Sequence, residues 1–295
     1  MKLDNILVIA DRDDPKQLAV RAALDLLPAP AGRLRIVGFV YEHAAEEPGV
    51  LSATAAATLK DALLAARQQW LDQSVAELRP DAGRLQVEAV WAKDIVDWTV
   101  EAVLRDGIDL VVKTGNRSET LFYTPTDWQL LRRCPVPVLI ASNRLRRRSR
   151  CILATIDAGS TDQIQVELNR KVLAAAARLG ALLNAQVHVA YVVPVSTVAK
   201  DLDLIDADAL EREARKKLGP PLAATAGKYG IPAEHIVIKA GQPDRVLSSI
   251  AARLKTDIVV MGTVGRTGIC GKLLGNTAEQ VMHRLHASML ALRPG

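Results

Sequence analysis

Asp257-Ile-Val-Val-Met261 runs directly into Gly262-Thr-Val-Gly-Arg-Thr-Gly-Ile-Cys-Gly-Lys-Leu-Leu-Gly-Asn-Thr277. The apolar residues after Asp257 have the character of a buried strand, and the loop leads into a helical pattern at 278–284. The glycines at 262, 265 and 275 would let backbone amides approach an anion without hindrance from a Cβ atom. The helix that follows would direct the positive end of its dipole at the same place. The stretch therefore predicts a strand, an anion-binding loop and a helix.

The chain contains two copies of one sequence plan, which are offset by about 146 to 148 positions. Asn5-Ile-Leu-Val-Ile-Ala-Asp11 corresponds to Cys151-Ile-Leu-Ala-Thr-Ile-Asp157, a short apolar run that ends in aspartate. The period is too long for a solenoid, so the repeat predicts two duplicated domains. We expect them to span residues 1–143 and 151–295, with a basic linker at 144–150.

Apolar runs alternate with helical patterns in each copy. In the second copy we expect strands at 151–156, 186–193, 234–239, 257–261 and 287–292, and helices at about 162–180, 206–229, 243–254 and 276–286. Parallel strands need helical crossovers, and the strands are continuously apolar, as expected when both faces are covered. The pattern therefore predicts an α/β fold with parallel sheets and helices on both faces.

Composition limits the class of protein. The 295 residues are 49% apolar and 24% charged, which is typical of a soluble globular chain, and no apolar run approaches the ~20 residues of a membrane span. The amino terminus does not have the pattern of a secretory signal, so we expect a cytoplasmic location. The net charge of +5 owes much to Arg144-Leu-Arg-Arg-Arg-Ser-Arg150. This run is either a solvated linker or a docking patch for an acidic partner, and nucleic acid is not excluded.

Ligands of open parallel sheets bind beyond the carboxyl ends of the strands, where the strand order reverses. In the second half this rule brings together Asp157, Val192 and the loop that follows Met261. The aspartate suits hydrogen bonding to a ribose hydroxyl or a base, and the valine suits packing against adenine. The loop suits phosphates, with side chains that add cations or hydrogen-bond donors: Arg266, Lys272, Asn276 and Thr277.

The spacing Gly262-x2-Gly265-x9-Gly275, followed by Asn276, resembles the ATP-binding signature of the universal stress protein family. The segment Tyr123-Thr-Pro-Thr-Asp-Trp-Gln-Leu-Leu-Arg-Arg-Cys134 resembles tandem, two-domain bacterial members of that family. The resemblance implies two open twisted five-stranded parallel sheets of the adenine nucleotide alpha hydrolase-like fold. It also implies ATP, alone or with Mg²⁺, as the ligand. The implied contacts are Asp157, Val192, Met261, Gly262, Gly265, Arg266, Gly275, Asn276 and Thr277.

The first half has a different loop at the matching place. Only Gly115 remains of the glycines, and Glu119 brings a negative charge to the segment where phosphates would lie. We therefore expect this half not to bind ATP in the family manner. All four tryptophans and both phenylalanines belong to this half. They indicate either core and inter-domain packing or a cleft for an apolar ligand.

The resemblance implies a nucleotide-responsive regulator of stress resistance that holds ATP in its second half and acts on an unknown protein partner. The alternatives are a carrier of a small apolar or lipid-like ligand in the first half, and a slow ATPase. No residue is an evident base for water, so we expect no catalytic residue. His283 and His286 lack an evident third ligand, so we expect no metal site. Association of two chains is left open.

Overall fold

The computed structural model describes residues 1–11, 14, 16–28, 32–78, 82–115, 125–142, 150–195, 206–263, 281 and 284–294. Contacts between Cα atoms divide this part of the chain into two compact units. One unit runs from Lys2 to residue 142, and the other begins at Arg150. The predicted domain limits at 143 and 151 stay a prediction, since most of the linker lies outside the described residues.

The first unit is built on parallel strands in the order β3-β2-β1-β4-β5. The strands are β1 (Asn5–Ile9), β2 (Arg33–Val40), β3 (Leu85–Trp91), β4 (Leu110–Thr114) and β5 (Val138–Ala141). The helices are α1 (Leu18–Leu26), α2 (Ala53–Ala76), α3 (Ile95–Asp106) and α4 (Pro125–Arg133), with short 3-10 turns η1 (His43–Ala45) and η2 (Ala82–Arg84).

The second unit repeats the same strand order as β8-β7-β6-β9-β10, again with every described pair parallel. Its strands are β6 (Cys151–Thr155), β7 (Gln186–Pro194), β8 (Ile236–Gly241), β9 (Ile258–Gly262) and β10 (Ser288–Leu292). Its helices are α5 (Gln163–Leu183), α7 (Ala207–Gly227) and α8 (Pro243–Arg253), with the turn η3 (Ala233–His235) before β8.

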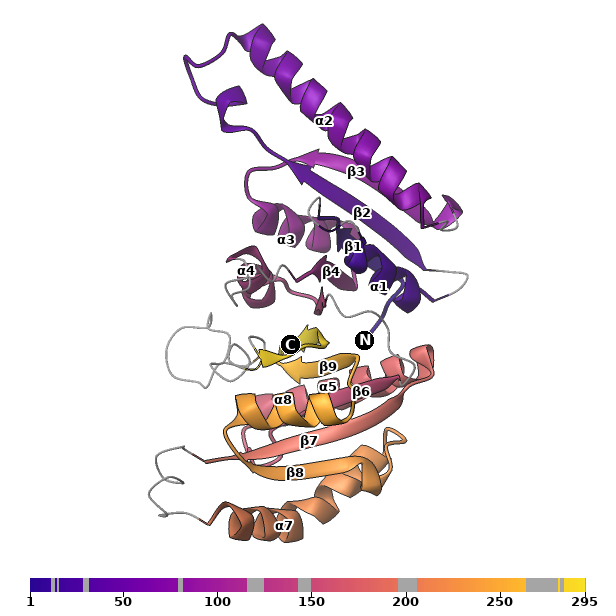
Figure 1. Ribbon diagram of the computed structural model, residues 1–295, viewed down its shortest axis with the longest axis vertical. Helices are drawn as coiled ribbons and strands as arrows, with labels where there is room; N and C mark the ends of the chain where they lie inside the picture. The colour runs from indigo at the N-terminus through magenta and orange to yellow at the C-terminus, as the bar shows by residue number, and fades with distance from the viewer. Residues whose placement is uncertain are drawn as a thin grey trace. The chain divides into compact units, whose positions relative to one another are not determined.

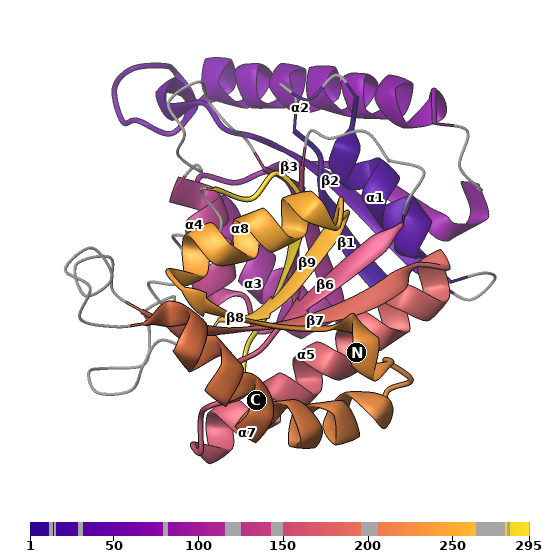
Figure 2. The same cartoon turned by 60° about the horizontal axis from the view of Figure 1, so that its bottom comes forward.

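Helices cover both faces of each sheet, which explains the continuously apolar strands. In the first unit α2 packs on the face of β2 that carries Gly38, and α3 packs on the opposite face through the Phe39–Trp98 ring pair. Figure 1 shows α2 lying along β2 and β3. In the second unit α8 and α5 lie on opposite sides of the sheet (Figure 2). The core is the apolar layer on each side of the central strands β1 and β6.

Local sequence signals set the ends of several helices. Asp94 caps α3 by accepting from the amides of Val96 and Asp97, and Gly107 ends that helix at a φ of 63°. Helix α2 begins at Ala53, because the hydroxyl of Ser52 caps it by accepting from the amide of Ala55 at 3.2 Å. This helix, α2, continues to Ala76.

The predicted fold class is confirmed, with two α/β halves and parallel strands. The predicted strands and helices of the second half agree with the structure to within a few residues, except the helix at 276–286, most of which lies outside the described residues. No helix in the described ranges is long and apolar enough to span a bilayer.

Candidate functional site

The central strand of the second half, β6, brings the described part of the predicted site together. Thr155, at the end of β6, pairs with Ala190 of β7 on one side and with Met261 of β9 on the other. Asp157 lies two residues beyond Thr155, and Val192 lies two residues beyond Ala190. The chain reverses its strand order between β6 and β9, which is where ligands of such sheets bind.

The backbone of Asp157 is held by one side chain from α5. Asn169 accepts a hydrogen bond from the Asp157 amide at 3.1 Å and donates to the Asp157 carbonyl at 2.8 Å. Gln165 donates to the same Asn169 oxygen at 3.0 Å, which fixes the orientation of its amide group. The loop after β6 therefore has a fixed backbone where its aspartate is presented.

The carboxylate of Asp157 is exposed and partly used by its own loop. Its Oδ1 accepts from the Gly159 amide at 3.2 Å, whereas Oδ2 accepts no hydrogen bond from the described residues. The hydroxyl of Tyr191 on β7 packs against the same loop at Gly159, because a Cβ added to Gly159 would lie only 2.4 Å from the hydroxyl oxygen. Burial raises the pKa of Tyr191, and the charge of Asp157 adds to the shift. The neutral phenol is therefore a hydrogen-bonding group beside a free carboxylate oxygen.

Apolar residues complete the described edge. Val192 is 8% exposed, and Met261 is buried at 4%. A glycine at position 262 allows Leu168 of α5 to pack closely against the end of β9. A Cβ at this position would lie 2.3 Å from Cδ2 of Leu168 on α5. We expected this glycine only to open a path for backbone amides, and the contact with Leu168 gives it a structural reason independent of any ligand.

The remaining predicted site residues lie outside the described part of the chain. These are Gly265, Arg266, Gly275, Asn276 and Thr277, together with Lys272. The structure thus places four of the predicted residues at one edge, Asp157, Val192, Met261 and Gly262, and says nothing of the loop.

The same edge of the first half is occupied by an internal ion cluster. Ile9 pairs with Lys113 as Thr155 pairs with Met261, so Lys113 takes the place of Met261. Its Nζ lies 2.9 Å from Asp127 Oδ1 on α4 and 3.5 Å from Oδ2 of Asp11, the counterpart of Asp157. The Lys113 side chain is 6% exposed and that of Asp127 is fully buried. The first-half aspartate thus faces a cation of its own chain.

A second polar contact fills the position of Gly262 in the first half. Thr114 stands there, and its hydroxyl donates to Asp14 Oδ2 at 2.8 Å and accepts from the amide of Ala19 at 3.1 Å. Asp14 also accepts from the amide of Leu18 at 2.6 Å. The start of α1 is therefore tied to the end of β4 by side chains, where the second half has a bare glycine.

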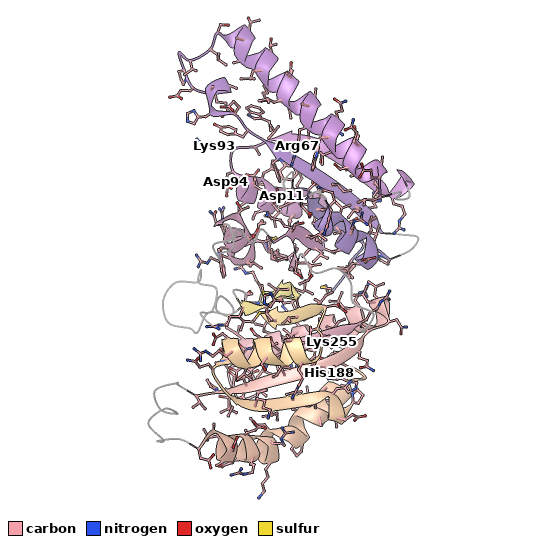
Figure 3. The ribbon with its side chains drawn as sticks, viewed as in Figure 1. Asp11, Arg67, Lys93, Asp94, His188 and Lys255 are labelled. Carbon is pink, nitrogen blue, oxygen red and sulfur yellow. The ribbon has the colours of Figure 1, made fainter. Side chains whose placement is uncertain are left out.

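An arginine from α2 reaches the same edge. Arg67 donates from Nη2 to the carbonyl of Ala10 at 2.9 Å, next to Asp11 (Figure 3). It lies over Gly38, whose added Cβ would be 2.7 Å from Arg67 Nε. By strand register Gly38 corresponds to Tyr191 of the second half. The two halves therefore fill equivalent space with different chemistry.

Sequence reasoning missed several of these residues. Asn169 lies in an amphipathic helix pattern, and its type alone does not reveal that it bonds to a distant loop. Lys113 carried a usable signal, because a charged residue that interrupts the apolar run Leu110-Val-Val112 must find a buried partner. The tryptophans were expected either in core and inter-domain packing or around a cleft for an apolar ligand. The structure leaves all four half-buried, with Arg67 stacked 4.2 Å from the Trp70 ring and Lys60 5.2 Å from the Trp91 ring.

The described residues offer no cluster of three or more His, Cys, Asp or Glu side chains that could hold a metal ion. The groups at the carboxyl edge of the second half, an exposed carboxylate, a phenol and an aliphatic wall, suit a sugar and a base. Phosphates and any accompanying Mg²⁺ would need residues of the loop.

Comparison with known proteins gives a consistent result. The sequence matches the Universal stress protein family over residues 2–142 and 161–293. It is 29% identical to the universal stress protein E homolog of Haemophilus influenzae, over all of this chain and 98% of that protein. It is 28% identical to universal stress protein E of Escherichia coli K12, over 98% and 94% of the two chains.

A solved structure extends the likeness to three dimensions. The crystal structure of a functionally unknown protein from Pseudomonas aeruginosa PAO1 superposes with a TM-score of 0.72 at 25% identity, covering 99% of this chain and 92% of that one. Two copies of one parallel α/β plan, the match of both copies to one family, and full-length relatives support one conclusion. The chain belongs to the universal stress protein family and has the tandem arrangement of universal stress protein E.

Proposed function

We propose that the second half binds ATP or a related adenine nucleotide, and that the bound nucleotide makes the protein a regulator in stress resistance. Membership of the family gives the stress-related role. The nucleotide is our inference from the carboxyl edge of β6, β7 and β9. A cytoplasmic location and a protein partner stay predictions.

The observation that carries the proposal is the contrast between the two matching aspartates. Asp157 has a backbone fixed by Asn169 and a carboxylate oxygen without a hydrogen bond from described residues. Asp11 has Lys113 within 3.5 Å. An exposed acceptor on a rigid loop suits a ribose hydroxyl, whereas an acceptor paired with an internal ammonium group does not. This supports one nucleotide for each chain.

The roles follow from the chemistry of each group. Asp157 would accept from a ribose hydroxyl, with the Tyr191 hydroxyl as a neighbouring donor. Val192 and Met261 would form the apolar wall against the base. Amides of the loop that begins at Gly262, with Arg266, would hold the phosphates. No described side chain at this edge is placed as a base for water, so we assign no hydrolysis.

The carrier alternative has less support. A cavity of the first half is lined by four arginines together with Asn5, Gln86 and Asp106, and so many polar groups do not suit an apolar ligand. Slow hydrolysis would be an addition to nucleotide binding and not a competitor of it.

Paired variants test the proposal. Calorimetry with ATP should show one site for each chain, and Asp157→Asn should weaken it roughly tenfold, as expected when a charge-assisted hydrogen bond to the ligand becomes a neutral one. Asp11→Asn is the matched control and should leave the affinity unchanged. Gly265→Val should abolish binding if the loop holds the phosphates. Equal effects of the two Asn variants, or no binding of ATP by the wild-type chain, would reject the site.

A further inference from the structure

The first half has a cavity at the amino-terminal edge of its sheet, where β1, β2 and β3 begin and α3 ends. Its volume is about 600 Å³, within the range of roughly 300–1,000 Å³ that small-molecule sites occupy. The polar residues that line it include Asn5, Arg33, Arg35, Arg84, Arg105 and Asp106. We call Arg33, Arg35, Arg84 and Arg105 together the arginine groove.

Two members of the arginine groove are held rigidly. Arg35 forms ion pairs with Glu88 and Asp106, and its guanidinium lies 5.1 Å from the centre of the Trp98 ring. Arg84 donates from Nε to the carbonyl of Gly32 at 2.9 Å and from Nη2 to that of Pro28 at 2.6 Å. A guanidinium that is already fixed loses little freedom when it binds a ligand, so this arrangement favours tight contacts.

The groove holds more positive than negative charge. Its four guanidinium groups are contacted by two carboxylates of the described chain, Glu88 and Asp106, which leaves two positive charges. Arg33 is exposed and has no ion pair with any residue that the structure describes. The carboxyl end of α3 adds only about half a negative charge. The remaining excess is what a small dianion would neutralise.

The fold does not require an arginine at position 33 or 35. By strand register Arg35 corresponds to His188 of the second half, and Arg33 corresponds to Gln186. The second half forms the same strands with two stacked imidazole rings, those of His188 and His235, whose centroids lie 4.3 Å apart. Four like charges around one cavity, two of them at positions where the other half has no arginine, point to a ligand.

We propose that the arginine groove binds a small molecule that carries a phosphate group. Planar guanidinium groups match phosphate oxygens in pairs, and charge-assisted hydrogen bonds of this kind are stronger than neutral ones. The groove lies at the amino-terminal edge of the first sheet, so it is distinct from the carboxyl-edge site of the second half and does not depend on the ATP proposal.

Inorganic pyrophosphate is a suitable probe, because it has no base or sugar. All four tryptophans lie in the first half, so a change of intrinsic fluorescence reports on that half. Trp98 lies against Arg35 and should respond most, and Trp98→Phe should remove most of the signal. We expect saturable binding by wild-type protein and by Gly265→Val, the substitution that should abolish phosphate binding at the proposed ATP site.

The decisive variant is Arg33→Gln with Arg105→Gln. Both side chains are exposed, so folding should be preserved, and affinity for pyrophosphate should fall by at least about tenfold as two charge-assisted contacts are lost. The control, Arg212→Gln with Lys216→Gln, removes the same charge from exposed positions of α7 and should bind as wild type. Equal affinity of the two double variants would overturn the proposal. The proposal would also be overturned if the wild-type protein did not bind pyrophosphate at millimolar concentration, or if it bound only to vesicles of anionic lipid.

Discussion

Asn169 bonds both backbone polar groups of Asp157, with its oxygen 3.1 Å from the amide nitrogen and its nitrogen 2.8 Å from the carbonyl oxygen. The two residues are twelve positions apart, on α5 and on the loop after β6. In the first half a different residue does this, since Gln17 donates from its side-chain amide to the carbonyl of Asp11 at 3.0 Å. Each half therefore fixes its aspartate loop, but by a different side chain.

Replacing Asn169 by alanine should uncouple the Asp157 loop from α5. We expect the free energy of unfolding to fall by about 1–2 kcal/mol, since two hydrogen bonds to the backbone are lost. ATP affinity should fall roughly tenfold because Asp157 is no longer held in place. Urea unfolding and calorimetry give the two values.

Gln165→Ala is the control for Asn169, because Gln165 donates to the Asn169 amide oxygen and, among the described residues, makes no hydrogen bond to Asp157. It should have less than half the effect on both quantities. An Asn169→Ala protein that loses stability but keeps full ATP affinity would show that Asn169 is structural only.

Gly262→Ala tests the packing reason for that glycine. The added Cβ would lie 2.3 Å from Leu168, so we expect a loss of about 1–3 kcal/mol of stability from overpacking. Gly227→Ala at the end of α7 is the control, since a Cβ there has no neighbour within 4 Å, and it should be neutral or stabilising.

Leu168→Ala should relieve the clash at residue 262. In a double-mutant cycle the two substitutions should couple by about 1 kcal/mol or more, in the direction of mutual rescue. Strict additivity would mean that the backbone moves away instead, and the contact with Leu168 would then not explain the glycine.

The parallel architecture was predictable because it rests on patterns that recur along the chain. Apolar runs such as Ile258-Val-Val-Met261 specify strands covered on both faces, and the repeat specifies two halves. The carboxyl edge followed from topology alone, so Asp157, Val192 and the loop that begins at Gly262 could be assigned to one edge in advance. The alternation of strands and helices brings these residues to one edge of the sheet, and that alternation can be recognised in the sequence.

The contacts that distinguish the halves were not predictable in the same way. These contacts are made by side chains whose partners lie far away in the sequence, and no spacing rule predicts such contacts. Examples are Asn169, Tyr191 and Arg67. Lys113 was the exception. Its charge within a buried strand required a partner, although only the structure identifies Asp127 on α4.

Lys113→Met gives the first half the residue found at the same place in the second. It leaves the carboxylate of Asp127 buried without its ammonium partner, so we expect a loss of about 3–5 kcal/mol in a urea unfolding experiment. Lys113→Met with Asp127→Leu removes both charges and should recover most of that loss.

Lys239→Met provides the matched comparison for Lys113. Its ammonium lies 2.9 Å from Glu211, as close as Lys113 lies to Asp127, but the Lys239 side chain is 41% exposed. Its removal should cost no more than about 1 kcal/mol. Similar losses for the two single variants would contradict the view that burial makes the first-half ion pair essential.

The stacked rings of His188 and His235 should make stability depend on pH. Burial lowers the pKa of His188 below its ordinary value, and the charge of His235, whose ring lies 4.3 Å away, lowers it further. The unfolded chain then binds a proton more readily than the folded one. The contribution of His188 to stability should be fully present above the ordinary His pKa of about 6.5 and should decline as pH falls from there to the lower folded pKa.

Urea unfolding between pH 5 and 8 measures this pH dependence, and His188→Gln should flatten the decline in stability. His43→Gln, at an exposed position beside Glu47, should not change it. If the pH profile of His188→Gln matched that of wild type, the ring pair would not be the source of the dependence.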